Sequence, residues 1–177
     1  MKTTIYLLLL FFVPFLSFAQ SEKQYQSFHF KKQVVVPGDS ITVFDWLTGD
    51  ISPWWDHTFS KKPHKLYIEP KPGGGFWEIF NENGDGVLHA TVIAAHRGKL
   101  LRFDGPLGLS GKAVQLVCTY QLTGVPNDST RLVLEVNGAG AMNEQLPKII
   151  EKVWDHFIFE QFVPFSKKKF NELKRFD

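Results

Sequence analysis

The chain has 177 residues, of which 44% are hydrophobic and 21% charged, so it has the composition of one globular domain and not of a disordered segment. Its 20 basic and 18 acidic residues nearly cancel, which excludes the basic footprint of a nucleic-acid-binding protein. The one cysteine excludes an internal disulfide framework and a multi-cysteine zinc site.

Residues 1–19 are predicted to be a secretory signal peptide. A basic residue follows the first methionine, an apolar run extends from Ile5 to Phe18, and small residues precede the expected cut after Ala19. The run is shorter than the ~20 residues that a helix needs to span a bilayer, and Pro14 interrupts it. We therefore expect export to the periplasm or the cell exterior, and a mature chain, 20–177, with no membrane span.

The mature chain begins with a strand followed by two short helical segments. Apolar and polar residues alternate from Tyr25 to Val36, which predicts a strand that a Pro-Gly pair ends. Asp39 or Ser40 can then cap a short helix that reaches Leu47. After a glycine, Ile51–Trp55 is predicted to be a second short helix or a turn.

Six antiparallel strands are expected next, separated by turns that are rich in glycine and proline. The predicted strands are His64–Glu69, Phe76–Phe80, Val87–Ala95, Lys99–Asp104, Val114–Leu122 and Thr130–Val136. Asn83-Gly84-Asp85-Gly86 is a strong hairpin signal between the second and the third of these. The clearest alternation places four apolar side chains on one face: Val114, Leu116, Cys118 and Tyr120.

The last segment changes to the apolar spacing of an amphipathic helix, which Pro164 is expected to kink or end. Its apolar stripe consists of Leu146, Ile149, Ile150, Val153, Trp154, Phe157 and Ile158. One long helix can cover the apolar face of a curved antiparallel sheet, so we expect an α+β fold of six to seven strands around it. Such an arrangement commonly leaves internal space for a ligand, and the aromatic content of 15% indicates a large core or a ring-lined cavity.

Five segments in this order resemble the START-like (SRPBCC) superfamily over about residues 28–165. They are Trp54-Trp55, Glu69-Pro70-Lys71-Pro72-Gly73-Gly74, Phe76, Leu88-His89-Ala90-Thr91-Val92 and Leu101-Arg102-Phe103. The resemblance is to the branch named after the activator of the ninety-kilodalton heat-shock chaperone's ATPase. It implies a helix-grip fold, in which a sheet grips a long C-terminal helix over a hydrophobic cavity, for a single domain spanning 20–177.

The same resemblance implies a broad range of functions. Members bind lipids, sterols, polyketides or hormones; some are cyclases and some are chaperone cofactors. An exported protein does not meet a cytosolic chaperone, so we do not expect that partner here. The resemblance provides no set of catalytic residues that applies to the whole family.

Ten residues are candidates for a ligand-binding cavity: Trp54, Trp55, Phe76, Glu78, His89, Phe103, Tyr120, Trp154, Phe157 and Ile158. The tryptophan pair can form an aromatic wall or plug the junction between the short helices and the sheet. The helix residues can line a cavity or be ordinary core, since burying one such side chain stabilises by ~1.5–3 kcal/mol.

Three polar residues lie on predicted strands among apolar ones. An inward carboxylate at Glu78 or Asp104 would have a raised pKa and could act as an acid or base, whereas strand alternation could equally point it to solvent. His89 is the best candidate for an inward polar group, with a rim or surface position as its alternative.

The remaining motifs predict no cofactor or metal. Gly73-Gly74-Gly75 precedes a strand, so it is read as a tight turn and not as a phosphate-binding loop. The six histidines include no H-E-x-x-H motif and no pair four residues apart on a predicted helix. We expect an exported carrier or sensor of a small hydrophobic ligand. The alternatives are a cyclase- or isomerase-type enzyme that uses Glu78, Asp104 or His89, and a protein-interaction module with a filled core.

Overall fold

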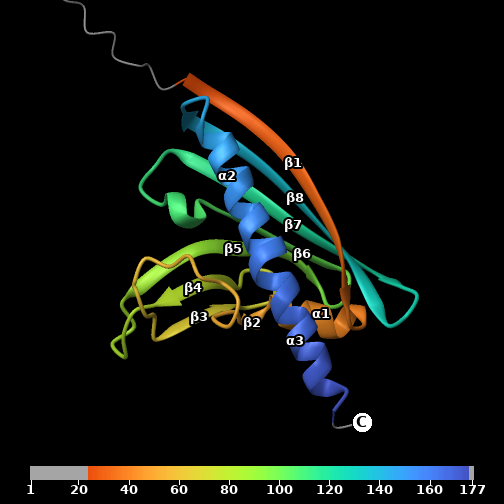
Figure 1. Ribbon diagram of the computed structural model, residues 1–177. Coiled ribbons are helices and arrows are strands. Elements are labelled where there is room, and N and C mark those ends of the chain that lie inside the picture. The colour runs from red at the N-terminus through yellow and green to blue at the C-terminus, as the bar shows by residue number, and fades with distance from the viewer. Residues whose placement is uncertain (1–23, 176–177) are drawn as a thin grey trace, which may run out of the picture.

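The alternating segments form one antiparallel sheet of eight strands, seen in a computed structural model that describes residues 24–175 (Figure 1). The strands are β1 (Gln24–Pro37), β2 (Gly49–Asp50), β3 (Lys65–Ile68), β4 (Gly75–Ile79), β5 (Gly86–His96), β6 (Leu100–Gly105), β7 (Val114–Val125) and β8 (Ser129–Met142). Their order in the sheet is β1-β8-β7-β6-β5-β4-β3-β2. The predicted signal peptide, residues 1–19, lies outside the described residues.

The sheet has one strand more than the six to seven expected, and the additional strand is the short β2. Gly49 and Asp50 pair with Ile68 and Tyr67 of β3, and two residues cannot show an alternating pattern. β1 and β2 therefore lie at opposite edges of the sheet, and helix α1 (Ser40–Leu47) connects them. The side chain of Asp39 caps α1, as predicted, by accepting hydrogen bonds from two of its first backbone N–H groups.

The predicted second short helix is a single hydrogen-bonded turn. The N–H groups of Trp54 and Trp55 both donate to the carbonyl of Ile51, at 3.1 and 2.9 Å. The N–H of Ser52 donates to the side chain of Asp50, and none of the N–H groups of residues 56–58 continues the pattern, so the segment ends after one turn. The chain then continues as a loop, residues 56–64, before β3.

The long C-terminal helix continues through Pro164, contrary to the expectation that it could end there. It consists of α2 (Leu146–Asp155), a π-helical segment η2 (His156–Phe162) and α3 (Val163–Leu173). The N–H of Val163 donates to the carbonyl of Ile158, five residues earlier. This wider turn makes the room that a proline ring needs against the preceding carbonyls, so the helix accommodates Pro164.

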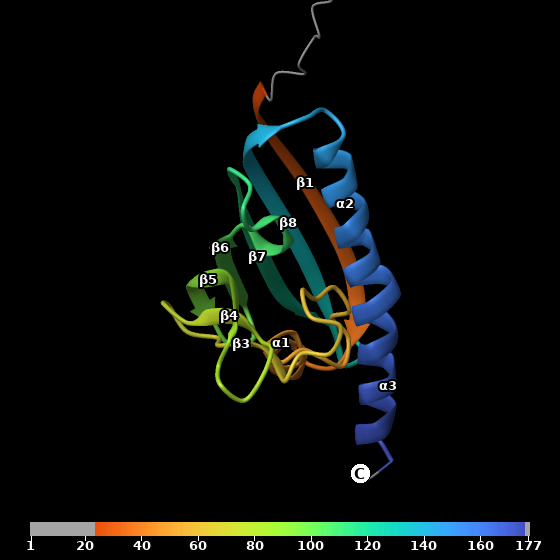
Figure 2. The same ribbon diagram turned by 90° about the vertical axis from the view of Figure 1, so that its left-hand side faces the viewer.

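The helix lies along one side of the sheet rather than over its centre. Figure 2 shows α2 and α3 running beside β1 while β3 to β6 curve away from them. The Nζ of Lys32 on β1 reaches Glu151 and Asp155 on α2, at 2.7 and 2.9 Å. Burial lowers the pKa of Lys32, but these two carboxylates outweigh it and raise that pKa, so the lysine stays charged.

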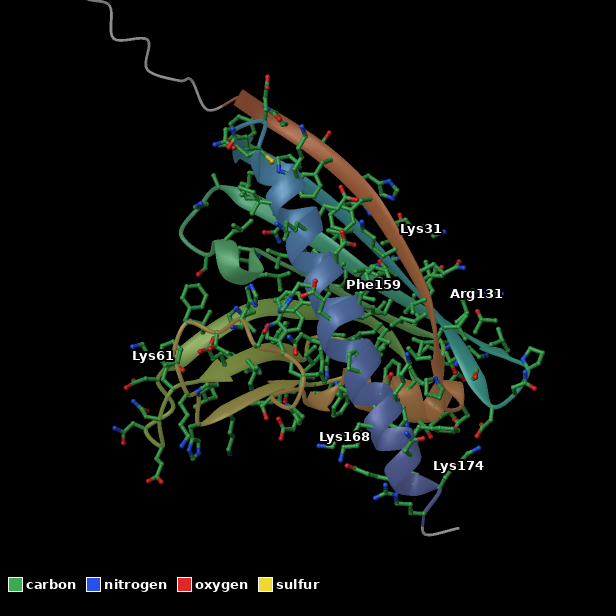
Figure 3. All side chains as sticks on the ribbon, in the orientation of Figure 1. Lys31, Lys61, Arg131, Phe159, Lys168 and Lys174 are labelled. Carbon is green, nitrogen blue, oxygen red and sulfur yellow. The ribbon has the colours of Figure 1, made fainter. Side chains whose placement is uncertain are left out.

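The inner face of the sheet and the helix enclose an aromatic core. Trp55 is its centre: its ring stacks on Phe157 with centroids 3.9 Å apart and meets Phe76 and Trp154 edge-on at 5.0 and 5.8 Å. The outer face of the sheet is polar, and Lys31 on β1 and Arg131 on β8 are exposed there (Figure 3). Within residues 24–175, no helix combines the length and apolarity that crossing a bilayer requires.

β8 extends six residues beyond its predicted end at Val136. Glycines in this extension allow the backbone near Ala113 to approach closely. Gly140 has φ +148°, and a Cβ there would lie 2.1 Å from the carbonyl oxygen of Ala113. Glycines are poor strand formers, so the sequence pattern gave no sign of this extension.

Gly140→Ala is therefore expected to lower the free energy of unfolding by about 1–3 kcal/mol, through backbone strain and overpacking. Gly124→Ala in β7 is the matched control, since a Cβ there has no neighbour within 4 Å. Urea denaturation of both variants measures the difference. Equal stability of the two variants would contradict the close approach of β8 to Ala113.

Candidate functional site

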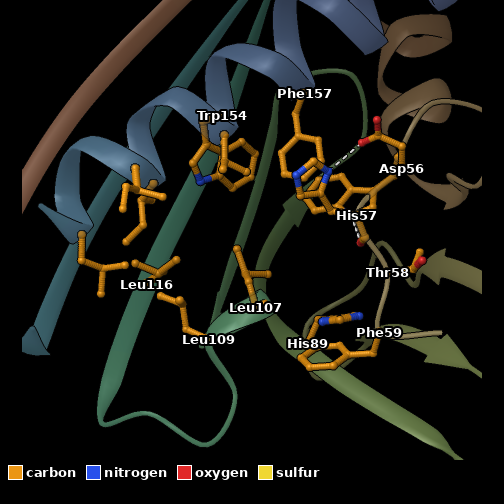
Figure 4. Close-up of a pocket in the computed structure, with 16 residues that line it drawn as sticks. Asp56, His57, Thr58, Phe59, His89, Leu107, Leu109, Leu116, Trp154 and Phe157 are labelled. Carbon is orange, nitrogen blue, oxygen red and sulfur yellow. Dashed lines mark hydrogen bonds and ion pairs between the residues drawn. The ribbon is translucent and has the colours of Figure 1, made fainter. Parts of the chain in front are cut away.

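A cavity of about 540 Å³ lies between α2, the 3₁₀ turn η1 (Leu107–Leu109), β7 and the loop 56–59 (Figure 4). Its size is within the range of small-molecule sites. It is lined by Trp55, Asp56, His57, Thr58, Phe59, His89, Leu107, Gly108, Leu109, Leu116, Leu146, Ile149, Ile150, Val153, Trp154 and Phe157.

Most of the wall is aliphatic or aromatic. Leu107, Leu109 and Leu116 lie across the space from the helix side chains Trp154 and Phe157 (Figure 4). Leu107 has φ +51°, a left-handed conformation that costs a non-glycine residue ~1–3 kcal/mol. This strained turn holds a buried leucine side chain on the cavity wall.

The polar end of the cavity contains His89, which a β-bulge directs inward. Phe76 pairs with Ala90 and Trp77 pairs with Leu88, so His89 is the extra residue of β5 at this point. His89 and Ala90 are consequently both buried although they are neighbours in the chain. The ring of Phe59 stacks on His89 with centroids 5.5 Å apart and forms the outer side of this end.

Behind His89 lies Glu78, whose side chain is fully buried. Its carboxylate accepts hydrogen bonds from the N–H of Phe59 at 2.9 Å, the N–H and hydroxyl of Ser60 at 2.7 and 3.0 Å, and Nε2 of His89 at 3.0 Å. Burial raises the pKa of Glu78, but these hydrogen bonds outweigh it and the pKa is lowered. The inward carboxylate is thus ionised, and the raised pKa expected from its sequence position was wrong.

The ionised Glu78 decides which nitrogen of His89 carries the proton. A carboxylate only accepts hydrogen bonds, so Nε2 of His89 must donate, and in the neutral imidazole Nδ1 is then an acceptor. Within residues 24–175, Nδ1 of His89 has no hydrogen-bond partner. The surrounding protein atoms do not enclose it completely. His89 lines the cavity, so Nδ1 is the nitrogen of this ring that could accept a hydrogen bond from a bound ligand.

The sequence-predicted site residues divide into two groups. Four of the ten line the cavity: Trp55, His89, Trp154 and Phe157. Six do not: Trp54, Phe76, Glu78, Phe103, Tyr120 and Ile158. Apart from Glu78, these six are aromatic or aliphatic core residues beside the cavity, because ring packing around Trp55 fills the centre between sheet and helix. Asp104 lies on the outer face of β6, where it accepts a hydrogen bond from Gln115.

Other lining residues were not singled out from the sequence. Leu116, Ile149, Ile150 and Val153 were on predicted apolar faces, but periodicity does not separate core from cavity wall. The loop residues, including Leu107 and Asp56–Phe59, have no periodic signal at all. Ile149 is 54% exposed and Phe59 49% exposed, which places them at the mouth of the cavity.

At this mouth, the loop is joined to the helix by an ionic cluster. Asp56 contacts Nδ1 of His57 and Nε2 of His156, each at 2.8 Å, and Glu160 contacts Nδ1 of His156 at 2.8 Å. Hydrogen bonds that the ring of His156 donates to the carboxylates of Glu160 and Asp56 raise the pKa of His156. Burial raises the pKa of Asp56, but hydrogen bonds from His57 and His156 outweigh it and the pKa is lowered.

This cluster predicts a pH dependence of stability in a metal-free buffer containing EDTA. The pKa of His156 is raised above its ordinary value of 6.5, so its contribution is fully present below that value and lost as the pH rises through the folded-state pKa. The difference in unfolding free energy between wild type and His156→Gln should therefore shrink from pH 6 to pH 9. A constant difference over this range would contradict the pairing of His156 with Asp56 and Glu160.

Comparisons with known proteins show the fold alone. No protein family model matches this sequence, and no curated protein matches it. Mll3558 from Rhizobium loti is similar in structure, with a TM-score of 0.57 and 17% identity over 76% of this chain and 94% of that one. SA2116 from Staphylococcus aureus, a protein of unknown function, has a TM-score of 0.53 and 10% identity over 84% of this chain and 94% of its own. DynU16, from the dynemicin biosynthetic locus, has a TM-score of 0.54 and 16% identity over 78% of this chain and 47% of its own.

Proposed function

We propose that the protein is an exported carrier or sensor of a small, mostly apolar ligand, belonging to the START-like superfamily near the branch that its sequence resembles. The observation that carries this proposal is the cavity of about 540 Å³ between α2 and the sheet. Its walls are apolar except at one end, where His89 and the loop 56–58 lie. The sequence of residues 1–19 supports export.

The arrangement of polar groups indicates the chemistry of the ligand. Burial of its apolar body would provide most of the binding energy, at ~25 cal/mol per Å² removed from water. Nδ1 of His89 would accept a hydrogen bond from a hydroxyl or N–H group at the polar end. The ligand class is therefore a hydrophobic molecule with a donor at one end, such as an alcohol of lipid-like or polyketide-like type.

A second candidate, an acid–base enzyme of the cyclase or isomerase type, is favoured by the pair of Glu78 and His89. His89 could accept a proton from a bound ligand at Nδ1, and Glu78 would stabilise the resulting imidazolium. Two acid–base groups facing one cavity would have favoured this candidate further. Of Glu78, His89 and Asp104, however, only His89 lines the cavity, so the carrier is the better supported function.

Extraction of the purified protein with organic solvent, followed by mass spectrometry, tests the proposal. We expect an apolar molecule with a hydroxyl or N–H group to co-purify at a stoichiometry near one. Absence of any such molecule, together with no uptake of long-chain alcohols or sterols in native mass spectrometry, would overturn the carrier proposal. A filled core with an exposed docking face, the third possibility raised by the sequence, would give that result.

A further inference from the structure

A cluster of metal-ligating side chains lies at the mouth of the cavity, where the loop meets the helix. Asp56 and His57 are adjacent on the loop, and His156 is the first residue of the π-helical segment. One ligating atom from each of the three lies within 4.8 Å of the other two. Sequence spacing gave no sign of this cluster, because its two parts are 100 residues apart in the chain.

We propose that Asp56, His57 and His156 bind a divalent transition-metal ion of the Zn²⁺ type. Two imidazole nitrogens and one carboxylate oxygen are a donor set that this ion prefers, with bonds of ~2.0–2.2 Å. Such bonds hold ligand atoms within about 4 Å of each other, so the present spacing needs only small side-chain rotations. All three side chains are partly exposed, which leaves them free to make these rotations.

The surroundings of His156 support this assignment. Glu160 contacts its Nδ1 at 2.8 Å, which leaves Nε2 directed at Asp56. A carboxylate on the far nitrogen of a ligating histidine is the usual outer-shell arrangement, because it fixes the tautomer that coordinates the metal. Without a metal, the imidazole of His156 contacts both carboxylates, Asp56 through Nε2 and Glu160 through Nδ1. A metal ion would lie between Nε2 of His156 and the carboxylate of Asp56.

Two further features fit a built site. His156 and Glu160 belong to the π-helical segment, a rare distortion that is frequent at functional sites. The ring of His57 packs edge-on against Phe157, with centroids 4.8 Å apart, so one edge of the ring lies against the hydrophobic wall of the cavity. Asp56 and His57 also line the cavity, so the open coordination position of a three-ligand site would face the mouth.

The test is titration of untagged protein, residues 20–177, with Zn²⁺ by calorimetry and with Co²⁺ by visible absorption, in the absence of any apolar ligand. We expect one ion per chain, with affinity reduced at least tenfold in His57→Ala and in His156→Ala. Glu160→Gln should reduce the affinity about 10- to 100-fold, as outer-shell changes do. His96→Ala, an exposed histidine at the end of β5, is the matched control and should bind as wild type does.

Circular dichroism of each variant verifies folding, and Asp56→Asn, which keeps the size of the side chain, provides a further test if an alanine variant unfolds. Equal binding by wild type and His156→Ala would overturn the site, as would the absence of stoichiometric binding by wild type. Because the probe is the metal alone, failure here would not affect the carrier proposal.

Discussion

Replacing Glu78 with alanine is expected to lower the free energy of unfolding by about 3–5 kcal/mol, because each buried donor left without an acceptor costs ~1–3 kcal/mol. Four donors, from Phe59, Ser60 and His89, would lose their common acceptor. For a chain of this length the loss corresponds to a fall of roughly 6–20 °C in melting temperature. Chemical denaturation followed by tryptophan fluorescence measures the difference.

The control is Glu82→Ala, an exposed carboxylate in the hairpin between β4 and β5. The effect also has a defined pH dependence. The folded-state pKa of Glu78 lies below its ordinary value of 4.5, so its stabilisation is present above that value and lost as the pH falls through the folded-state pKa. If Glu78→Ala were as stable at pH 7 as Glu82→Ala, the loop 56–60 would not depend on this carboxylate.

Filling the cavity is expected to weaken ligand binding at least tenfold without unfolding the protein. Ile150→Trp places an indole ring, which is larger than the isoleucine side chain, in the space between α2 and Leu116. Excluding as little as about 60 Å² of apolar ligand surface costs about 1.5 kcal/mol, which is about a tenfold loss of affinity. We therefore expect at least this loss for a fluorescent apolar probe such as N-phenyl-1-naphthylamine, measured by titration.

Phe159→Trp is the matched control, because it lies on the same helix and its side chain is 42% exposed on the outer face (Figure 3). Its affinity for the probe should equal that of wild type. Unchanged probe binding by a folded Ile150→Trp variant would place the apolar site elsewhere.

Much of the architecture could be predicted from the sequence because it depends on periodicity. Alternation in β7 and the helical stripe that includes Ile150 and Trp154 each identify one buried face, and an antiparallel sheet covered by a helix follows. The errors arose where hydrogen bonding determines the outcome over a few residues. β2 is too short to show a pattern, the segment after Ile51 forms a single hydrogen-bonded turn, and a π-helical segment accommodates Pro164.

The candidate site was less predictable, for a physical reason. Cavity walls and packed cores use the same apolar residues, so Trp154 and Phe103 look alike in the sequence although only the first lines the cavity. The bulge that turns His89 inward depends on pairing with β4, a non-local contact. The environment of Glu78 depends on the loop residues Phe59 and Ser60, whose position no periodicity indicates.

The proposed ligand occupies the space between α2 and the sheet, with its polar end at His89. A crystal structure of the protein with a bromine-labelled long-chain alcohol tests it directly. We expect an anomalous bromine peak among Leu107, Leu116 and Trp154, and a hydroxyl within ~2.7–3.2 Å of Nδ1 of His89. A helix packed directly against η1, with no space between them and no bromine there, would contradict it.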